Sequence, residues 1–369
     1  MKVAFLALHF SEYAVRCGEQ LRKEANMLLI CETVNAREEL GSDFIAKVDG
    51  AGNSVAFIAR NASFFGVVRN SNELIQEVLN FCPDVIHLQE ASVNFVPLSI
   101  LRLRSFPLAI TIHDPLPHSG EGGKSINSLR HDFNRRLLRR LADSAITHGE
   151  ALVKIVERQY PRLRGRSYSV PHGPLGGPPL DTSAQIGTFL FFGRIQAYKG
   201  LRYFVAAIRK LHDQGLSVRG VIAGRGGDLA RHRALIDGHP AFELHERYIA
   251  HDELPSLFAR TQAVVLPYVD GTQSGVAAMA LGFGRAIIAT RVGALQDMVR
   301  DGDNGLLVPP GDADALAAAM ARLMAAPDEA ARMGKRSVEL GQTDLSWQRN
   351  AQITLQAYEA AIRRKREAG

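Results

Sequence analysis

The sequence predicts an α/β protein of two domains, each built on a parallel, doubly wound sheet. Short apolar runs of strand length alternate with amphipathic helical stretches, which is typical of a parallel sheet covered on both faces. The alternation stops in residues 171–185, which are rich in proline and glycine, and then restarts. A chain of 369 residues is also long enough for two domains. We therefore expect a binding cleft between the domains.

The first domain is expected to span residues 1–173. Its strands are predicted from apolar runs at residues 3–8, 27–31, 85–88, 106–113, 144–148 and 167–170, with a weaker one at 55–58. Its helices are predicted from spacing of three and four residues at 12–23, 71–81, 124–142 and 150–160. Ser11 is the candidate N-cap of the first helix.

The second domain is expected to span residues 186–345, after a linker at 174–185. Its strands are predicted at residues 188–192, 218–223, 243–249, 263–267 and 286–290, with a last one from 305. Its helices are predicted at 201–213, 228–237, 253–260, 275–281 (closed by Gly282), from 294, 312–324 and 328–340. A final helix, 346–369, is expected to pack back on the first domain.

The composition restricts the partners and the compartment. A net charge of +6 favours an anionic partner, but phosphate esters, nucleic acid and a membrane surface fit it equally. No basic segment interleaved with aromatic residues supports nucleic-acid binding. Cys17, Cys31 and Cys82 form no pair typical of a zinc site, and we interpret them as buried thiols in a reducing compartment. No apolar run is long enough to span a membrane.

One stretch of the second domain, residues 266–307, combines the elements of an anion site. A buried strand leads into a loop of small and polar residues, Asp270 to Ser274, and a helix starts at Gly275. Free backbone donors and a helix N-terminus attract anions. Arg194 and Lys199 follow another strand of this domain, where two cations could clamp a diphosphate.

Two further patterns are interpreted as structural. Asp301-Gly302-Asp303 and Asp312-Ala313-Asp314 have the Asp-x-Asp spacing of a metal site, but the first lies in a Gly-Asn turn and the second begins a helix. We therefore expect no metal. Residues 118–125 end like a phosphate-binding loop, but His118 stands where the first glycine belongs, so a flexible loop is expected there.

The order and spacing of several motifs resemble the retaining nucleotide-sugar glycosyltransferases of family 4, which have the GT-B fold. The resemblance is strong over residues 191–324 and weaker in the first half, at 84–87, 113–114 and 170–173. It rests on Gly193-Arg194 followed by Lys199-Gly200, on Ala278-Met279-Ala280-Leu281-Gly282, on Val292-Gly293-Ala294 and on residues 301–312.

The resemblance implies a role for each of these residues. Arg194 and Lys199 would hold the donor's diphosphate and stabilise the leaving group, and His113 would face the donor sugar. Backbone groups of Arg247, Tyr248 and Ile249 would hold the base. The remaining donor-binding positions are Gly193, Asp270, Thr272, Gln273, Ser274, Gly275 and Val276. Charge grows on the phosphate as the glycosidic bond breaks, so preorganised donors would favour that state.

The sequence also departs from the family pattern. The family usually carries two glutamates, separated by seven residues, before Ala-Met-Ala, and Val269 and Ala277 stand at those positions here. Asp270, one place away, could serve for the first glutamate. The ribose contact of the second glutamate is in doubt, and we interpret Thr272 to Gly275 as a variant donor site. The Gly-Gly pair usual in the first domain is replaced by His9-Phe10-Ser11.

These observations predict a metal-independent, retaining glycosyltransferase without a cofactor. It would move a sugar from a UDP or GDP donor to a carbohydrate or lipid-linked acceptor in surface polysaccharide assembly. Two alternatives stay open: an inactive protein of this fold that binds nucleotide or glycan, and a sugar-nucleotide epimerase. The protein is expected in the cytoplasm. Residues 130–140, basic on an amphipathic helix, could rest on the inner face of the plasma membrane or be an ordinary solvated face.

Overall fold

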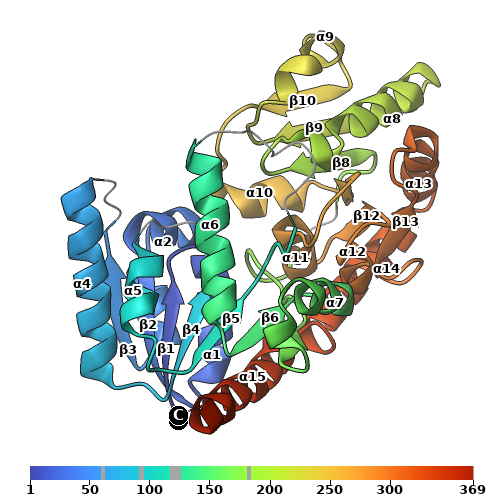
Figure 1. The fold of residues 1–369 in the computed structure, drawn as a ribbon. Coiled ribbons are helices and arrows are strands. Elements are labelled where there is room, and N and C mark those ends of the chain that lie inside the picture. The colour runs from blue at the N-terminus through green and yellow to red at the C-terminus, as the bar shows by residue number, and fades with distance from the viewer. Residues whose placement is uncertain (60–62, 91–94, 117–125, 181–183, 369) are drawn as a thin grey trace. The chain divides into compact units, whose positions relative to one another are not determined.

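The computed structural model describes residues 1–59, 63–90, 95–116, 126–180 and 184–368. The chain divides into two compact units. Unit 1 comprises Met1–Pro115, Gly123–Gly173 and Trp347–Gly369, and unit 2 comprises Leu116–Gly122 and Pro174–Ser346. Each unit holds one parallel sheet (Figure 1). The predicted α/β class with two Rossmann-like sheets is confirmed.

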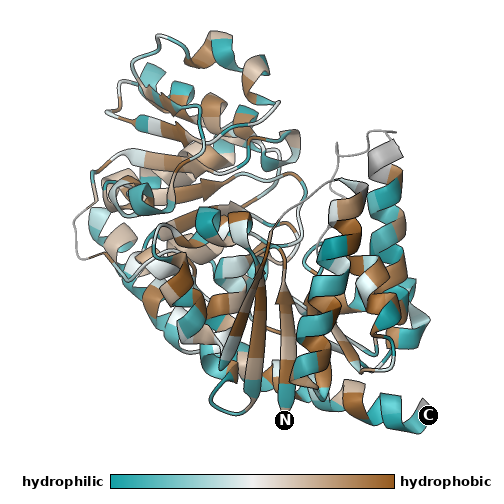
Figure 2. Ribbon diagram, turned by 90° about the vertical axis from the view of Figure 1, so that its left-hand side faces the viewer, coloured by the Kyte–Doolittle hydropathy of each residue, from teal (hydrophilic) through white to brown (hydrophobic). Residues whose placement is uncertain are grey.

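Sheet A of unit 1 has the strand order β3-β2-β1-β4-β5-β6-β7, and every pairing between neighbours is parallel. The strands are β1 (Lys2–Ala7), β2 (Asn26–Glu32), β3 (Ser54–Ile58), β4 (Val85–Gln89), β5 (Leu108–Thr111), β6 (Ser144–Thr147) and β7 (Ser167–Ser169). The central strands are buried almost along their whole length, β1 after Lys2 and β4 throughout, because helices cover both faces of the sheet (Figure 2).

The helices of unit 1 form two layers. They are α1 (Ser11–Leu21), α2 (Thr33–Leu40), α3 (Phe44–Ala51), α4 (Phe64–Phe81), α5 (Val96–Arg102), α6 (Ile126–Leu141), α7 (Glu150–Gln159), η1 (Pro161–Leu163) and α15 (Trp347–Ala368). Leucine, isoleucine and valine side chains of α4 to α7 fill the core on one face of the sheet. On the other face α15 packs against α1 and against strands β4 to β7, so the end of the chain belongs to unit 1.

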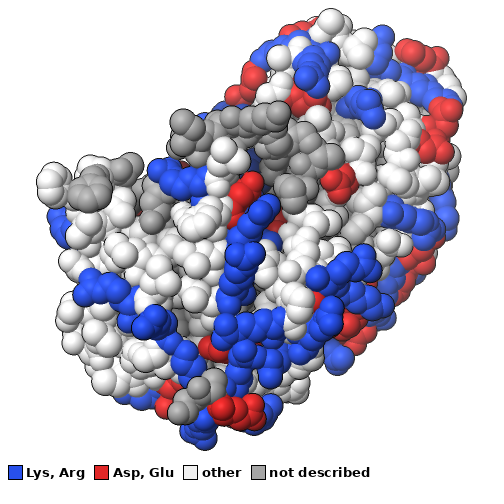
Figure 3. Space-filling view, viewed as in Figure 1, with Lys and Arg blue, Asp and Glu red and all other residues white. Residues whose placement is uncertain are grey.

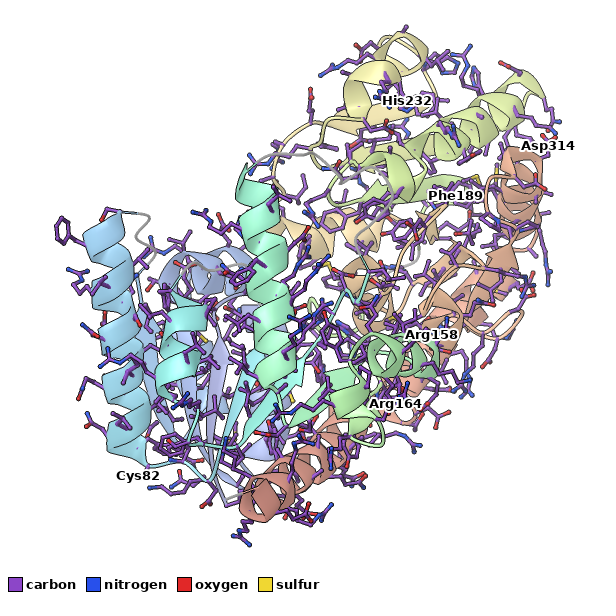
Figure 4. The ribbon with its side chains drawn as sticks, viewed as in Figure 1. Cys82, Arg158, Arg164, Phe189, His232 and Asp314 are labelled. Carbon is purple, nitrogen blue, oxygen red and sulfur yellow. The ribbon has the colours of Figure 1, made fainter. Side chains whose placement is uncertain are left out.

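Several predictions for unit 1 were wrong in detail. Ser11 is the first residue of α1, and Phe10 occupies the N-cap in the left-handed conformation. Helix α4 begins at Phe64, capped by Ser63, because the apolar face extends further back than residue 71. The stretch around α2, α3 and α5 was not predicted as helical. Cys82 is exposed at the end of α4, where it ends the helix in a left-handed conformation (Figure 4).

Sheet B of unit 2 has the order β10-β9-β8-β11-β12-β13, again with parallel pairings throughout. Its strands are β8 (Thr188–Phe192), β9 (Arg219–Ala223), β10 (Phe242–His245), β11 (Ala263–Leu266), β12 (Ala286–Thr290) and β13 (Gly305–Val308). Successive residues of β8 serve opposite faces: Phe189 and Phe191 join one core cluster, and Leu190 joins the other.

The helices of unit 2 cover both faces. They are η2 (Ala197–Lys199), α8 (Leu201–Asp213), η3 (Leu229–Arg231), α9 (Arg233–Ile236), η4 (His251–Glu253), α10 (Leu254–Ala259), α11 (Gly275–Phe283), α12 (Leu295–Met298), α13 (Ala313–Ala325) and α14 (Pro327–Gln342). Helices α8 and α13 pack on the face of Phe189, and α10 and α11 pack on the face of Leu190. Both faces of sheet B are therefore buried.

The predictions for unit 2 were wrong at three places. The expected helix 228–237 is two short pieces, η3 and α9, and strand β10 stops at His245 instead of 249. Helix α11 does not close at Gly282 but continues to Phe283, and Gly284 ends it in the left-handed conformation (φ 67°). Gly282 serves packing instead: a Cβ there would lie 2.1 Å from the carbonyl oxygen of Leu175.

Candidate functional site

The strand order of sheet B places its ligand-binding edge at β8 and β11. The chain leads from β8 outward to β9 and β10 on one side, and from β11 outward to β12 and β13 on the other. In open parallel sheets ligands bind at the carboxyl ends of the strands, at the point where this order reverses. The loops that follow β8 and β11, residues 193–200 and 267–274, flank that point.

These two loops pack closely against each other. A Cβ on Gly200 would lie 2.0 Å from the carbonyl oxygen of Pro267, so a larger residue does not fit. The amide of Val269 donates a hydrogen bond of 2.8 Å to the carbonyl of Tyr198. A Cβ on Gly193, at φ 101°, would lie 3.4 Å from both Lys199 Nζ and Val276 Cγ2. Three predicted site residues, Gly193, Lys199 and Val276, therefore meet at one place.

Helix α11 begins at this place. Ser274 is its N-cap in an extended conformation and accepts a hydrogen bond of 3.3 Å from the amide of Ala277. The hydroxyl of Tyr268 lies 3.1 Å from Ser274 Oγ and fixes the cap. The neighbouring Gln273 has a buried Oε1 that makes no hydrogen bond with any described residue. A buried acceptor without a partner is costly, so a ligand donor at Gln273 would lower the free energy.

The two predicted cations lie in the loop after β8. Arg194 is exposed and Lys199 is half-buried, and neither forms a salt bridge with the part of the chain that the structure describes. Lys199 Nζ lies 5.3 Å above the ring of Tyr268, which holds it against the loop. Lys199 lies beside the first turn of the nine-residue helix α11, and Arg194 belongs to the same loop as Lys199. Two cations near a helix N-terminus can bind a group with several negative charges, such as a diphosphate.

The third predicted part of the site follows β10. The side chain of Arg247 pairs with Glu253, at 2.7 Å and 2.5 Å, so the guanidinium is committed within the loop. Tyr248 is half-exposed, Ile249 is buried, and the carbonyl of His245 accepts from the amide of Gly224 at 3.0 Å. The loop is thereby fixed to the end of β9. The backbone of Arg247, unlike its guanidinium, is not engaged by Glu253.

Thr272 and Asp270 lie in the loop after β11. The carbonyl of Thr272 accepts a hydrogen bond of 2.7 Å from the amide of Ala294, and a Cβ on Gly293 would lie 2.0 Å from the carbonyl oxygen of Gly271. This contact joins the loop to the end of β12. The glycine of the Val-Gly-Ala motif therefore serves a close approach of backbones.

His113 belongs to unit 1, where it follows β5. The residue is buried, and its ring centroid lies 4.2 Å from that of Phe10 and 5.1 Å from that of His148, both in tilted arrangements. Both ring nitrogens are without a hydrogen bond to described residues. Burial, and then the neighbouring histidines, hold the pKa of His113 well below its usual value. The ring is therefore neutral at physiological pH and can accept or donate one hydrogen bond.

Sequence reasoning missed three features of these sites. The first is Tyr268, which supports both Lys199 and Ser274 and follows the predicted strand 263–267, where no pattern singles it out. The left-handed Phe10 beside His113 has no sequence signature, because glycine or asparagine usually takes that conformation. The five arginines of residues 130–140 were treated as one charged face, but Arg139 is buried and pairs with Glu90 through two contacts of 2.7 Å.

Comparison with known proteins identifies the family. A family model described as "Glycosyl transferases group 1" matches residues 187–326, the part of unit 2 that holds these loops. The chain is 27% identical over 310 residues to a glycogen synthase of Mycobacterium tuberculosis, covering 77% of this chain and 70% of that protein. It is 28% identical over 304 residues to a D-inositol 3-phosphate glycosyltransferase of Arthrobacter, covering 76% and 71%.

Residues 187–326 of the chain belong to the glycosyl transferases group 1 family. The chain is a glycosyltransferase with the GT-B fold. Its fold resembles that of Anabaena HepE, solved in complex with UDP and glucose, with a TM-score of 0.69 over 98% of this chain and all of that one, at 16% identity. The lipopolysaccharide outer core galactosyltransferase WaaB has a TM-score of 0.60 over 99% and 100%, also at 16% identity. The family predicted from the motifs is confirmed.

Proposed function

We propose that this family member transfers a sugar, with retention, from a nucleoside-diphosphate-sugar to a carbohydrate or lipid-linked acceptor. The meeting of Gly193, Lys199 and the first turn of α11 beside the carboxyl ends of β8 and β11, with Arg194 next to Gly193 in the chain, carries the proposal. The structural neighbour HepE was solved with UDP and with UDP-glucose, which favours UDP over GDP as the donor nucleotide. The proposed enzyme acts in the cytoplasm and takes part in the assembly of surface polysaccharides.

The chemistry follows from the charges at the site. As the bond between sugar and diphosphate breaks, negative charge grows on the leaving phosphate. Arg194, Lys199 and the amide groups at the start of α11 stabilise that charge more than the ground state, which lowers the barrier. The leaving phosphate accepts the acceptor's proton on the same face of the sugar. His113 would contact the donor sugar from unit 1, and the backbone near Arg247 would hold the base.

Nucleotide binding tests the donor site. UDP at millimolar concentration is expected to raise the Tm of the wild type, and the double variant Arg194→Ala with Lys199→Ala to weaken binding at least tenfold. Two lost charge-assisted hydrogen bonds of about 1.5–3 kcal/mol each support that size. Arg209→Ala with Lys210→Ala, on α8, is the matched control and is expected to bind as the wild type. Equal binding by all three proteins would contradict the proposed site.

The second candidate function is nucleotide binding without catalysis, and one observation favours it. Ala277, where the family usually has a glutamate, is fully buried in the core of unit 2, so it offers a ribose no side-chain contact. Release of free sugar from UDP-glucose by the purified protein, or its transfer to an acceptor, would favour the enzyme. Binding of UDP without either reaction would favour the second candidate. Conversion of the donor sugar without an acceptor would indicate the epimerase.

A further inference from the structure

The corresponding edge of sheet A lies between β1 and β4, where the strand order of unit 1 reverses. The loop after β1, residues 8–10, leads directly into α1 at this edge. A ligand of unit 1 is expected here, and the first amides of α1 would ordinarily attract a negatively charged group. The contacts of those amides therefore decide which ligand chemistry this edge can accept.

The N-terminus of α1 is already filled by two side chains of α2. Glu39 Oε2 accepts a hydrogen bond of 3.1 Å from the amide of Glu12, and the Glu39 carboxyl group also accepts from the amide of Phe10. Asn35 Oδ1 accepts from the amide of Ser11 at 3.1 Å and from its hydroxyl at 2.8 Å. Three consecutive amides are thus satisfied within the protein, and a carboxyl group stands where an anion would bind.

The two capping side chains are themselves held in place. Asn35 Nδ2 donates to Glu39 Oε1 at 2.7 Å, and the ring nitrogen of His9 lies 3.2 Å from the same amide. Glu32 caps α2 by accepting from the amides of Val34 and Asn35 at 3.0 Å and 2.8 Å. The cap of α1 is therefore a fixed part of the fold.

The loop itself presents rings at this edge. Phe10 is held at φ 59° and ψ 48°, a conformation that costs energy for a residue with a bulky side chain. Its ring lies 4.2 Å from His113 and 4.3 Å from His9. The Gln89 carboxamide, with its nitrogen turned toward the loop, donates to the carbonyls of His9 and Phe10 at 2.9 Å and 3.2 Å. Arg139 pairs with Glu90, the residue after β4, and so its charge is already matched within unit 1.

We propose that Glu39 and Asn35 determine acceptor specificity: they replace the ligand's anion at α1, so the acceptor group bound beside Phe10 is an uncharged sugar. A phosphate placed there would find its amide donors taken and would be repelled by Glu39. An uncharged sugar ring can lay its apolar face on the rings of Phe10 and His9 instead. This inference rests on the proposed function, because it assigns the acceptor to unit 1.

Phosphate binding tests the inference without turnover. The donor site is first disabled by Arg194→Ala with Lys199→Ala in the full chain, so that inorganic phosphate cannot bind there. In this parent protein we expect no saturable binding of phosphate by ³¹P NMR at millimolar concentration. Adding Glu39→Ala removes the carboxylate and frees amides of α1, and is expected to give saturable phosphate binding, at least tenfold tighter than any residual binding by the parent. Glu38→Ala, an exposed neighbour on α2, is the matched control and is expected to gain nothing.

A folded Glu39→Ala protein that gains no phosphate binding would overturn the inference, as would a parent that binds phosphate as tightly as this variant. If Glu39→Ala does not fold, Glu39→Gln retains an acceptor oxygen and removes the charge, and a measurable gain is expected from it; no gain in folded Glu39→Gln would then overturn the inference. These results are independent of the nucleotide experiment. Failure of the donor proposal and failure of the specificity proposal can therefore be told apart.

Discussion

At the scale of single residues, Gly282 shows how a motif can be recognised and its role misjudged. The glycine was expected to end a helix, but it lies inside α11. The amide of Leu175 donates to the carbonyl of Ala278 at 3.0 Å, so the chain after Pro174 runs directly along this helix. Absence of a side chain at Gly282 is what allows that approach.

Gly282→Ala is therefore expected to destabilise unit 2. The new methyl group would overlap the backbone of Leu175, and overpacking of this kind costs about 1–3 kcal/mol, which exceeds the gain of about 1 kcal/mol in helix propensity. The urea midpoint of unfolding measures the change. Gly275→Ala in the same helix is the control, since its Cβ would meet nothing closer than 3.8 Å. Equal midpoints for the two variants would contradict this account.

At the scale of elements, helix α6 exposes both apolar and basic side chains on one face. Leu129 and Phe133 are each 65% exposed, and Arg136 and Arg140 continue the same stripe at spacings of three and four residues. Arg135 pairs with Asp132 and Arg139 is buried, so fewer arginines face solvent than the sequence implied. Lysine and arginine side chains gather along α6 and over α7 in Figure 3. Exposed apolar groups beside cations suit the headgroup region of an anionic membrane.

We expect α6 to bind vesicles that contain phosphatidylglycerol, and not vesicles of phosphatidylcholine alone, in a sedimentation assay. Arg136→Glu with Arg140→Glu should weaken this binding at least tenfold, because each cation near an anionic surface contributes about 1 kcal/mol. Phe133→Ser should weaken it without changing the charge. The same charge reversal on α8, Arg209→Glu with Lys210→Glu, should leave it unchanged. Equal weakening by the α6 and α8 pairs would indicate a nonspecific charge effect.

The sequence predicts features that depend on neighbouring residues and misses those that join residues far apart in the chain. Strands such as β1 and β8 are continuous apolar runs between turns, so local pattern alone reveals them. The loops after β8 and β11 were found because their motifs are local in sequence. The pairing of Glu90 with Arg139 and the filling of the α1 N-terminus by Glu39 join residues 49 and 27 positions apart. Such contacts depend on how helices pack, and no periodicity encodes them.

At the scale of the whole molecule, unit 1 buries a group of neutral histidines. The rings of His113, His148 and His172 lie in succession, at 5.1 Å and 4.9 Å, against Tyr13. Burial lowers the pKa of His172 to about 4 and that of His87 to about 3. Burial, with the charge of neighbouring histidines, also lowers the pKa of His113 and His148. Folding of unit 1 therefore requires these rings to be uncharged.

The stability of unit 1 should therefore fall as the pH falls. Histidines of the unfolded chain take up protons near pH 6.5, whereas the folded His172 does so only near 4. Stability is complete above about pH 6.5 and is lost as the pH falls toward 4, by about 2 kcal/mol for His172 at pH 5. The Tm of unit 1 should fall between pH 7.5 and 5, and less so in His172→Gln. His212→Gln, on α8 of unit 2, is the control. An unchanged Tm at pH 5 would contradict the prediction.

The path of the chain through the two units has a further consequence. The chain passes from unit 1 to unit 2 after Gly173 and returns to unit 1 at Trp347. These two residues touch, because a Cβ on Gly173 would lie 2.4 Å from the indole ring of Trp347. Asn350 Nδ2 fastens the two passages by donating to the carbonyl of Pro171 at 2.8 Å. Residues 174–346 are thus an insertion between two adjacent points of another domain. A short linker from Gly173 to Trp347 would therefore span only the distance between two touching residues.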